Sequence, residues 1–285
     1  MVTAVSMSGG GELHQAAPVA TARARRQSTA QGRIAEVGAI AVLTRQTIVA
    51  SLRPPFTYGH ELVAQINFVI RTAWLPLVLT AFALAFGPAG VQAAGFYQLF
   101  GALDRLGGLF AVAVVREFGP LVCAIVIAGV AGTAMCADLG ARKIREELDA
   151  LAVLGVDVVK GVVAPRLIAL TIVTVLFDVF ALLFGVFAGI VITVIKGADI
   201  GPFFHTFYSQ ASPVELTASL IKTALFGAAV AVICCYKGMT ASGGAEGVGR
   251  AVNQAVVMSL LTVAVINYVF TQVLLATHPT LSVPK

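Results

Sequence analysis

Long apolar runs are the feature that most constrains the fold of this chain. A helix of about 20 apolar residues crosses the hydrocarbon core of a bilayer and pairs all of its backbone polar groups internally. Runs of this kind lie at residues 72–92, 109–135, 165–195, 214–236 and 251–275. The sequence therefore predicts an all-α, polytopic membrane protein with about five transmembrane helices, or six if one segment is re-entrant.

Composition supports this class and argues against several functions. Of 285 residues, 58% are hydrophobic and 12% are charged. In soluble domains about 45–50% of residues are apolar and about 25% are charged. The net charge of +5 comes from basic residues that lie mostly beside apolar runs, where they orient a membrane protein. No nucleic-acid partner is therefore expected. The scattered cysteines and histidines predict no metal site and no catalytic residue.

The distribution of basic residues predicts the orientation of the chain. Placing the N-terminus in the cytoplasm puts most lysines and arginines on the cytoplasmic side and leaves Arg105 and Lys196 outside. Residues 1–33 are expected to form a disordered cytoplasmic tail without a cleavable signal peptide, and residues 278–285 a C-terminal tail. The prediction is a multi-pass protein of the cytoplasmic membrane.

Residues 34–71 are expected to form interfacial helices. Residues 59–71 follow a helix-breaking Arg53-Pro54-Pro55 and carry apolar side chains on one face and polar ones on the other. Such a helix can lie in the membrane interface before the chain turns into the first span. Residues 34–52 are predicted to form a second interfacial helix.

Residues 137–154 interrupt the apolar sequence with a dense run of charges. At 100° per residue, Ile144, Leu148 and Leu151 share one face of a helix. The charged side chains on the opposite face are those of Arg142, Arg145, Glu146 and Asp149. The pattern predicts one amphipathic cytoplasmic helix with two ion pairs at a spacing of four residues, Arg142 with Glu146 and Arg145 with Asp149.

This helix has two interpretations. It could be a solvated loop helix, or it could be a coupling helix that docks on a soluble ATPase. The chain has no G-x-x-x-x-G-K-[ST] loop, which is the usual cradle for nucleotide phosphates. ATP chemistry would therefore come from a partner, and no cofactor is expected in this chain.

Charged residues also occur within the predicted spans. Arg116 and Glu117 lie in the outer half of the second span, where they could face a substrate cavity or form structural ion pairs. Asp178 lies in the middle of the third span and could be a proton or ion site. We favour the other interpretation, in which Asp178 pairs with Lys222 or with a backbone donor.

Small residues recur at a spacing of four in two spans. Gly185 and Gly189 form a G-x-x-x-G motif, and Ala124, Ala128 and Gly132 repeat the spacing on the second span. Small residues allow helix backbones to approach closely. We expect these contacts within the subunit more than between subunits.

Two blocks of motifs carry a resemblance to a known family. The first contains Arg116-Glu117-Phe118-Gly119-Pro120, Ala137-Asp138-Leu139-Gly140 and Glu146-Glu147-Leu148-Asp149-Ala150-Leu151. The second contains Phe226-Gly227, Cys235-Tyr236-Lys237-Gly238 and Gly243-Gly244-Ala245-Glu246-Gly247-Val248-Gly249-Arg250. Over about residues 60–275, the chain resembles the MlaE/YrbE family of ABC lipid-transporter permeases. It is most similar to the A-type YrbE subunit of actinobacterial (mycobacterial) Mce systems, with Asn267 standing where many MlaE proteins carry an aspartate.

The resemblance implies a permease domain over residues 72–277 and a set of partners. These are a related YrbE subunit or a second copy, two copies of a cytoplasmic ABC ATPase that binds ATP and magnesium, Mce-domain proteins outside the membrane, and a lipid substrate. The implied function is ATP-driven movement, by import, of fatty acids, sterols or related lipids. The alternative is a secondary transporter or channel that uses Asp178, Arg116 and Glu117.

The resemblance also implies two groups of site residues. The residues expected to couple to the ATPase are Arg142, Arg145, Glu146, Glu147, Asp149 and Leu151. The residues expected near a lipid pocket lined by spans one, two and five are Trp74, Leu75, Leu77, Val78, Arg116 and Glu117.

Overall fold

The computed structural model describes residues 17–54 and 58–278. The chain forms two compact units, Met1–Arg45 and Gln46–Lys285, and helix α1 (Ala17–Leu52) begins in the first and ends in the second. Residues 1–16 of the expected N-terminal tail lie outside the described residues. From Ala17 onward the tail belongs to α1, in agreement with the high helix propensity of its many alanines and arginines.

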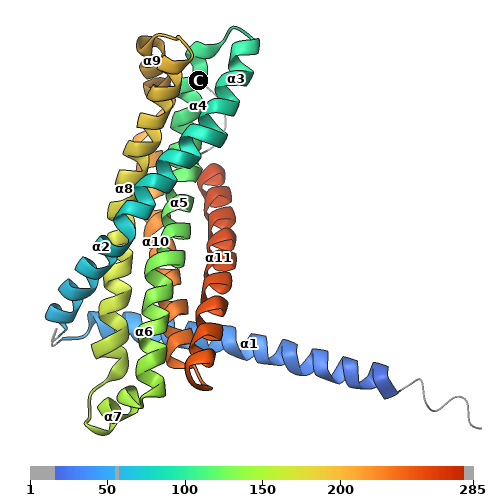
Figure 1. The fold of residues 1–285 in the computed structure, drawn as a ribbon, viewed down its shortest axis with the longest axis vertical. Coiled ribbons are helices and arrows are strands. Elements are labelled where there is room, and N and C mark those ends of the chain that lie inside the picture. The colour runs from blue at the N-terminus through green and yellow to red at the C-terminus, as the bar shows by residue number, and fades with distance from the viewer. Residues whose placement is uncertain (1–16, 55–57, 279–285) are drawn as a thin grey trace, which may run out of the picture. The chain divides into compact units, whose positions relative to one another are not determined.

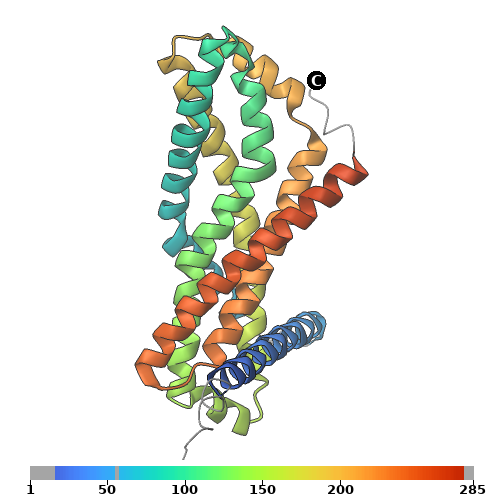
Figure 2. The same ribbon diagram turned by 90° about the vertical axis from the view of Figure 1, so that its right-hand side faces the viewer.

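Every regular element in the described part of the second unit is helical, which confirms the all-α prediction (Figures 1 and 2). After α1 the elements are α2 Gly59–Leu84, η1 Ala85–Val91, α3 Gln92–Leu99, η2 Leu103–Arg105, α4 Leu106–Phe110, η3 Ala111–Phe118, α5 Gly119–Val126, η4 Ile127–Gly132, α6 Thr133–Ile144, α7 Glu147–Val153, η5 Val159–Val163, α8 Ala164–Ile195, α9 Ile200–Gln210, α10 Pro213–Met239 and α11 Gly244–Thr277. η1, η3, η4 and η5 are π-helical turns, and η2 is a 3₁₀ turn.

Six helical segments among the described residues are long and apolar enough to cross a membrane. They are Ala35–Leu52, Gly59–Leu99, Leu103–Ile144, Val159–Ile195, Pro213–Met239 and Gly244–Thr277. The last five contain the five runs predicted from sequence. The first falls where an interfacial helix was expected, and its length and composition also permit a crossing. The structure therefore supports a polytopic protein with about six candidate spans.

The amphipathic segment 59–71 is not a separate interfacial helix. It continues into the first span without a break at residue 72, because α2 is one helix from Gly59 to Leu84. The helix packs along α8 and buries a stripe of residues four apart that includes Val69, Ala73 and Leu77. Within residues 59–71 only Val69 belongs to this buried stripe, and Val63 remains 66% exposed.

Small residues bring the helices into close contact within the chain, as expected. A Cβ atom added at Gly189 of α8 would lie 2.7 Å from Cδ1 of Phe110 in α4. A Cβ atom added at Gly132 would lie 2.9 Å from Sγ of Cys234 in α10. The helices α2, α8, α10 and α11 and the long Leu103–Ile144 segment pack on one another, with α7 at one end of the unit and α9 at the other (Figure 1).

Candidate functional site

The charged segment 137–154 is broken, and the single helix predicted there was wrong. Helix α6 ends at Ile144 and α7 begins at Glu147, with Glu146 between them in the left-handed region at φ 60°. The charges explain the position of the break. The last turn of α6 is basic and the first turn of α7 is acidic, and each charge is stabilised by the dipole of that helix end.

The break also changes the ion pairs. Neither of the predicted pairs at four-residue spacing forms. Arg145 pairs with Glu147 at 2.7 Å, and Lys143 reaches across the turn to Asp149 at 2.8 Å. Arg142 turns back to Asp138 at 3.1 Å. The Lys143–Asp149 pair connects α7 to the end of α6, and the Arg145–Glu147 pair lies within the turn itself.

The apolar side of α7 is divided between a buried part and an exposed part. Leu148 is buried, and Leu151 packs on a cluster that contains Leu139, Val162 and Val163. The next turn is uncovered, since Val153 is 88% exposed and Leu154 is 78% exposed. This small exposed apolar surface lies beside charged side chains at the end of the unit. Val153 is absent from the coupling residues expected from sequence.

An ion pair between a buried arginine and a half-exposed aspartate connects the base of the coupling segment to α8. Arg166 is 1% exposed, and its guanidinium donates to Oδ2 of Asp138 at 2.8 Å and to the carbonyl oxygen of Val162 at 2.9 Å. Its Nη1 also lies 3.7 Å from Oε1 of Glu61 in α2. Helices α2, α6 and α8 therefore meet at one guanidinium, directly above the turn that carries α7.

The charges of the second span are paired inside the helix bundle. Arg116 of η3 forms an ion pair with Glu215 of α10. Glu117 lies 3.5 Å from Lys222 and accepts hydrogen bonds of 2.9 Å from both Asn267 and Thr271 of α11. The partners lie far away along the chain, so no local pattern points to Glu215 as the counter-charge.

Asp178 accepts a hydrogen bond of 2.7 Å from the hydroxyl of Ser219. The partner is therefore a side-chain hydroxyl, in place of the expected Lys222 or backbone donor. The Lys222 ammonium instead donates to the carbonyl oxygen of Arg116 at 2.5 Å and faces Glu117. The other carboxylate oxygen of Asp178 is buried without a hydrogen-bond partner among the described residues.

The structure does not bring the expected lipid-pocket residues of α2 into one lining. Leu77 is fully buried in the α2–α8 packing, whereas Trp74 and Leu75 point outward and are 44% and 57% exposed. Val78 is half-buried. The Trp74 ring contacts the edge of the Phe180 ring, with centroids 6.2 Å apart. These residues could contribute to a pocket only at the outer surface of the unit.

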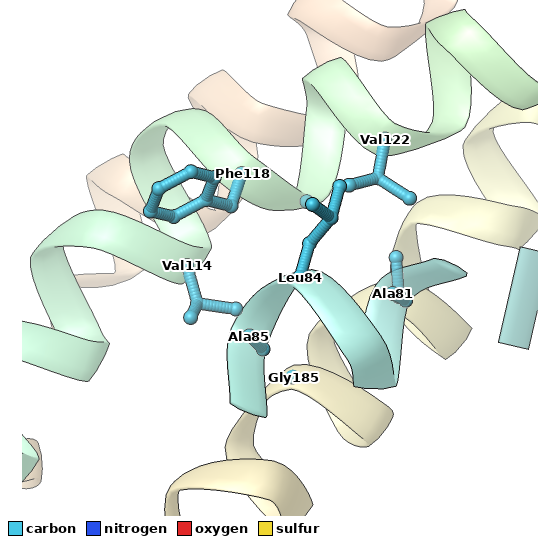
Figure 3. A pocket seen from close by; sticks show the side chains of 9 residues that line it. Ala81, Leu84, Ala85, Val114, Phe118, Val122 and Gly185 are labelled. Atoms are coloured by element: carbon cyan, nitrogen blue, oxygen red, sulfur yellow. The ribbon is translucent and has the colours of Figure 1, made fainter. Parts of the chain in front are cut away.

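A small apolar pocket does lie beside η3, between α2, α5 and α8 (Figure 3). It is lined by Leu84, Val114, Phe118 and Val122, among others, and its volume is about 10 Å³. This is room for about one water molecule. A single chain therefore provides no described cavity here that could hold an acyl chain.

Fold and site together define a polytopic helical membrane protein with a charged, folded projection at one end. Comparison with known proteins gives the family. The model of the family described as permease MlaE matches residues 62–273, which is most of the chain. The chain belongs to the MlaE permease family.

Individual relatives agree. A probable ABC transporter permease protein of Rickettsia bellii is 27% identical over 237 residues, which are 83% of this chain and 91% of that protein. One from Synechocystis is 34% identical over 180 residues, 62% of this chain and 68% of that protein. The intermembrane phospholipid transport system permease protein MlaE of Haemophilus influenzae is 31% identical over 177 residues, 61% of this chain and 68% of that protein. This chain is accordingly the permease type of subunit.

Proposed function

We propose that this chain is the membrane subunit of an ATP-driven lipid transporter, and that α7 with its flanking turn is the element on which a cytoplasmic ATPase acts. The observation that carries the proposal is the construction of this segment. It is anchored by the buried Leu148 and by the Lys143–Asp149 ion pair to α6, yet it presents the exposed side chains of Val153 and Leu154. A solvated loop needs no anchoring and gains nothing from exposed apolar side chains.

The path of the mechanical signal follows from the contacts. Movement of α7 acts on α6 through the Lys143–Asp149 pair, and on the start of α8 through the cluster that includes Leu151 and Val162. The Asp138–Arg166 pair, in which only the arginine is buried, ties these two helices together. A push on α7 is therefore transmitted to the long helices and is not absorbed by a flexible loop.

The lipid site is proposed to form between two permease subunits. The apolar pocket beside η3 is far too small, and α11 has an outward apolar face that includes Val257, Leu261 and Val265. An acyl chain could lie against such a face, and the exposed Trp74 and Leu75 of α2 are further candidates for the lining. Arg116 and Glu117 would lie near this site and set its polarity, with both charges balanced inside the protein.

The named relatives and the motif resemblance suggest the finer assignment. The Haemophilus relative is named for phospholipid transport. The Cys136–Glu147 segment and Asn267 favour an A-type YrbE subunit of an actinobacterial Mce system. In this proposal the chain pairs with a related YrbE subunit or a second copy and carries two ATPase copies. It receives fatty acids, sterols or related lipids from Mce-domain proteins and imports them across the cytoplasmic membrane, with its N-terminus inside.

The proposal is tested by neutralising the acidic start of α7 with Glu146→Gln and Glu147→Gln together. We expect lipid-stimulated ATP hydrolysis in the reconstituted complex to fall about tenfold, within the range that a coupling free energy of about 1–3 kcal/mol gives. Basal hydrolysis and assembly should remain. The matched control is Glu246→Gln, which removes another exposed acid at the same end of the unit. Equal lipid stimulation in the double variant and the control would contradict the proposal.

A second candidate, ion-coupled transport, is favoured by one observation only. The unpaired, buried oxygen of Asp178 is an arrangement that could bind a proton. Because the other oxygen is already held by Ser219, a structural role accounts for the position of this side chain without transport of a proton.

A further inference from the structure

A cavity of about 550 Å³ opens at the same end of the second unit as α7. One wall is the end of α1 and the residues after it, 46–54, and the other is the approach to η5, residues 157–160. Its size falls within the range of about 300–1,000 Å³ that small-molecule sites occupy. No part of the transport proposal uses this cavity.

Two basic side chains face the cavity from opposite walls, Arg53 and Lys160. Within the described ranges, neither side chain forms a hydrogen bond or an ion pair with a protein group. Most other basic side chains at this end do have an acidic partner. These are Arg142, Lys143, Arg145, Arg166 and Arg250. Two uncompensated cations that share one cavity favour an anionic ligand.

The acidic residue of the cavity does not neutralise them. Asp157 is exposed, and its Oδ1 accepts the backbone N–H groups of Val159 and Lys160 at 2.9 and 3.2 Å. This carboxylate is therefore engaged in fixing the start of η5. The three charged side chains leave the cavity with a net charge of +1. The opposite wall is fixed as well, because the buried Tyr58 donates a hydrogen bond of 2.8 Å to the carbonyl oxygen of Ser51.

The position of the cavity identifies the source of the anion. Lys160 lies in the first turn of the candidate span that begins at Val159, and Arg53 lines the same cavity. Both cations therefore lie at one membrane boundary, where lipid headgroups are found. Apolar side chains such as Val49 line the same cavity and suit the glycerol and upper acyl carbons. Basic pockets between transmembrane helices on the cytoplasmic side are a known arrangement for anionic headgroups.

We propose that this cavity is a binding site for the phosphate headgroup of an anionic glycerophospholipid, held between Arg53 and Lys160. The bound lipid joins the end of α1 to the start of α8. It is separate from the transported lipid, whose site is proposed at the outward face of α11 and α2. The inference therefore does not rest on the transport proposal.

The test uses the full chain in detergent, titrated with phosphatidylglycerol or phosphatidylcholine and analysed by native mass spectrometry. The wild-type protein should bind phosphatidylglycerol more tightly, and more weakly as salt is raised. We expect R53Q/K160Q to bind phosphatidylglycerol roughly 30-fold more weakly, because each basic group near an anionic headgroup changes affinity about fivefold. The charge-preserving variant R53K/K160R should retain binding.

The matched control is R105Q/K196Q, which removes two positive charges at the other end of the unit and should leave binding unchanged. Equal affinity of the wild-type protein for the two lipids would overturn the proposal, and this result needs no variant. So would unchanged binding by R53Q/K160Q. Displacement of phosphatidylglycerol by an equal concentration of inorganic phosphate would assign the cavity to a soluble anion and overturn the lipid assignment.

Discussion

Glu146 decides the local geometry of the proposed coupling segment. Among the described residues it is the only one other than glycine with a positive φ. A left-handed conformation costs a residue with a Cβ atom roughly 1–2 kcal/mol. The ion pairs of Lys143 and Arg145 on either side of the turn stabilise this conformation. They offset the steric cost of the left-handed backbone and fix the direction of α7.

Replacing Glu146 with glycine tests this view. We expect Glu146→Gly to leave the free energy of unfolding unchanged or to raise it by up to about 1 kcal/mol, because glycine adopts positive φ without steric cost. The same substitution at Glu246, in the first turn of α11, should lower stability by up to about 1 kcal/mol. Thermal unfolding of the purified variants in one detergent gives the comparison. Equal losses at the two positions would show that Glu146 is not strained.

Sequence reasoning identified the chemistry of individual residues better than their partners. Arg116, Glu117 and Asp178 were recognised as unusual because charges within spans are costly. Their actual partners lie as far as 154 residues away, as in the hydrogen bond from Thr271 to Glu117. No local pattern encodes such a pair, because it depends on the rotation of each helix about its own axis.

At the scale of elements, the long helices were predictable and their ends were not. The apolar runs located five of the six candidate spans. The amphipathic pattern of residues 137–154 predicts one continuous helix and does not reveal the break between α6 and α7. The signal was present in the order of charges, basic before the break and acidic after it, which suits two helix ends and not one helix interior.

Close packing of α4 on α8 gives a prediction at this scale. Gly189→Ala would place a Cβ atom 2.7 Å from Cδ1 of Phe110. Phe110 is 1% exposed and packs on Phe203, so it cannot move aside freely. We expect a loss of about 1–3 kcal/mol in the free energy of unfolding, the usual cost of overpacking a core.

Gly129 offers the matched control for this substitution. It lies on the exposed side of η4, and a Cβ atom there would meet nothing within 4 Å. Gly129→Ala should therefore stabilise the protein by about 0.5–1 kcal/mol through the lower entropy of its unfolded chain. Denaturation in detergent distinguishes the two variants. A Gly189→Ala protein as stable as Gly129→Ala would mean that α4 and α8 are not in contact.

At the scale of the whole molecule, a polar network joins α8, α10, α11 and η3 inside the membrane-spanning region. Buried pairs of this kind contribute little net stability but penalise any rearrangement that leaves one partner alone. The network therefore favours movement of these helices as one body. This is the behaviour that a lever acting on α7 requires.

Asp178→Asn separates the two candidate functions. The asparagine keeps an oxygen that can accept the Ser219 hydrogen bond but carries no charge and binds no proton. We expect lipid transport and ATP hydrolysis of the reconstituted complex to stay within about twofold of the wild-type values. The reason is that the Asp178 side chain has a structural role and contacts neither the proposed lipid site nor the ATPase. Loss of transport with intact ATP hydrolysis would instead favour ion coupling. Ser219→Ala is the companion variant, because it removes the donor and keeps the charge.

The sequence by itself determined that this chain is a helical membrane protein and where most of its spans lie. A run of about 20 apolar residues is a local property of the sequence. Such a run is stable as a helix in a bilayer whichever helices lie beside it. The tertiary structure alone decided that Arg116 pairs with Glu215, that Arg166 ties three helices together, and that Arg53 and Lys160 share a cavity. These arrangements depend on how the helices pack and rotate against one another, and packing is a property of the assembled chain.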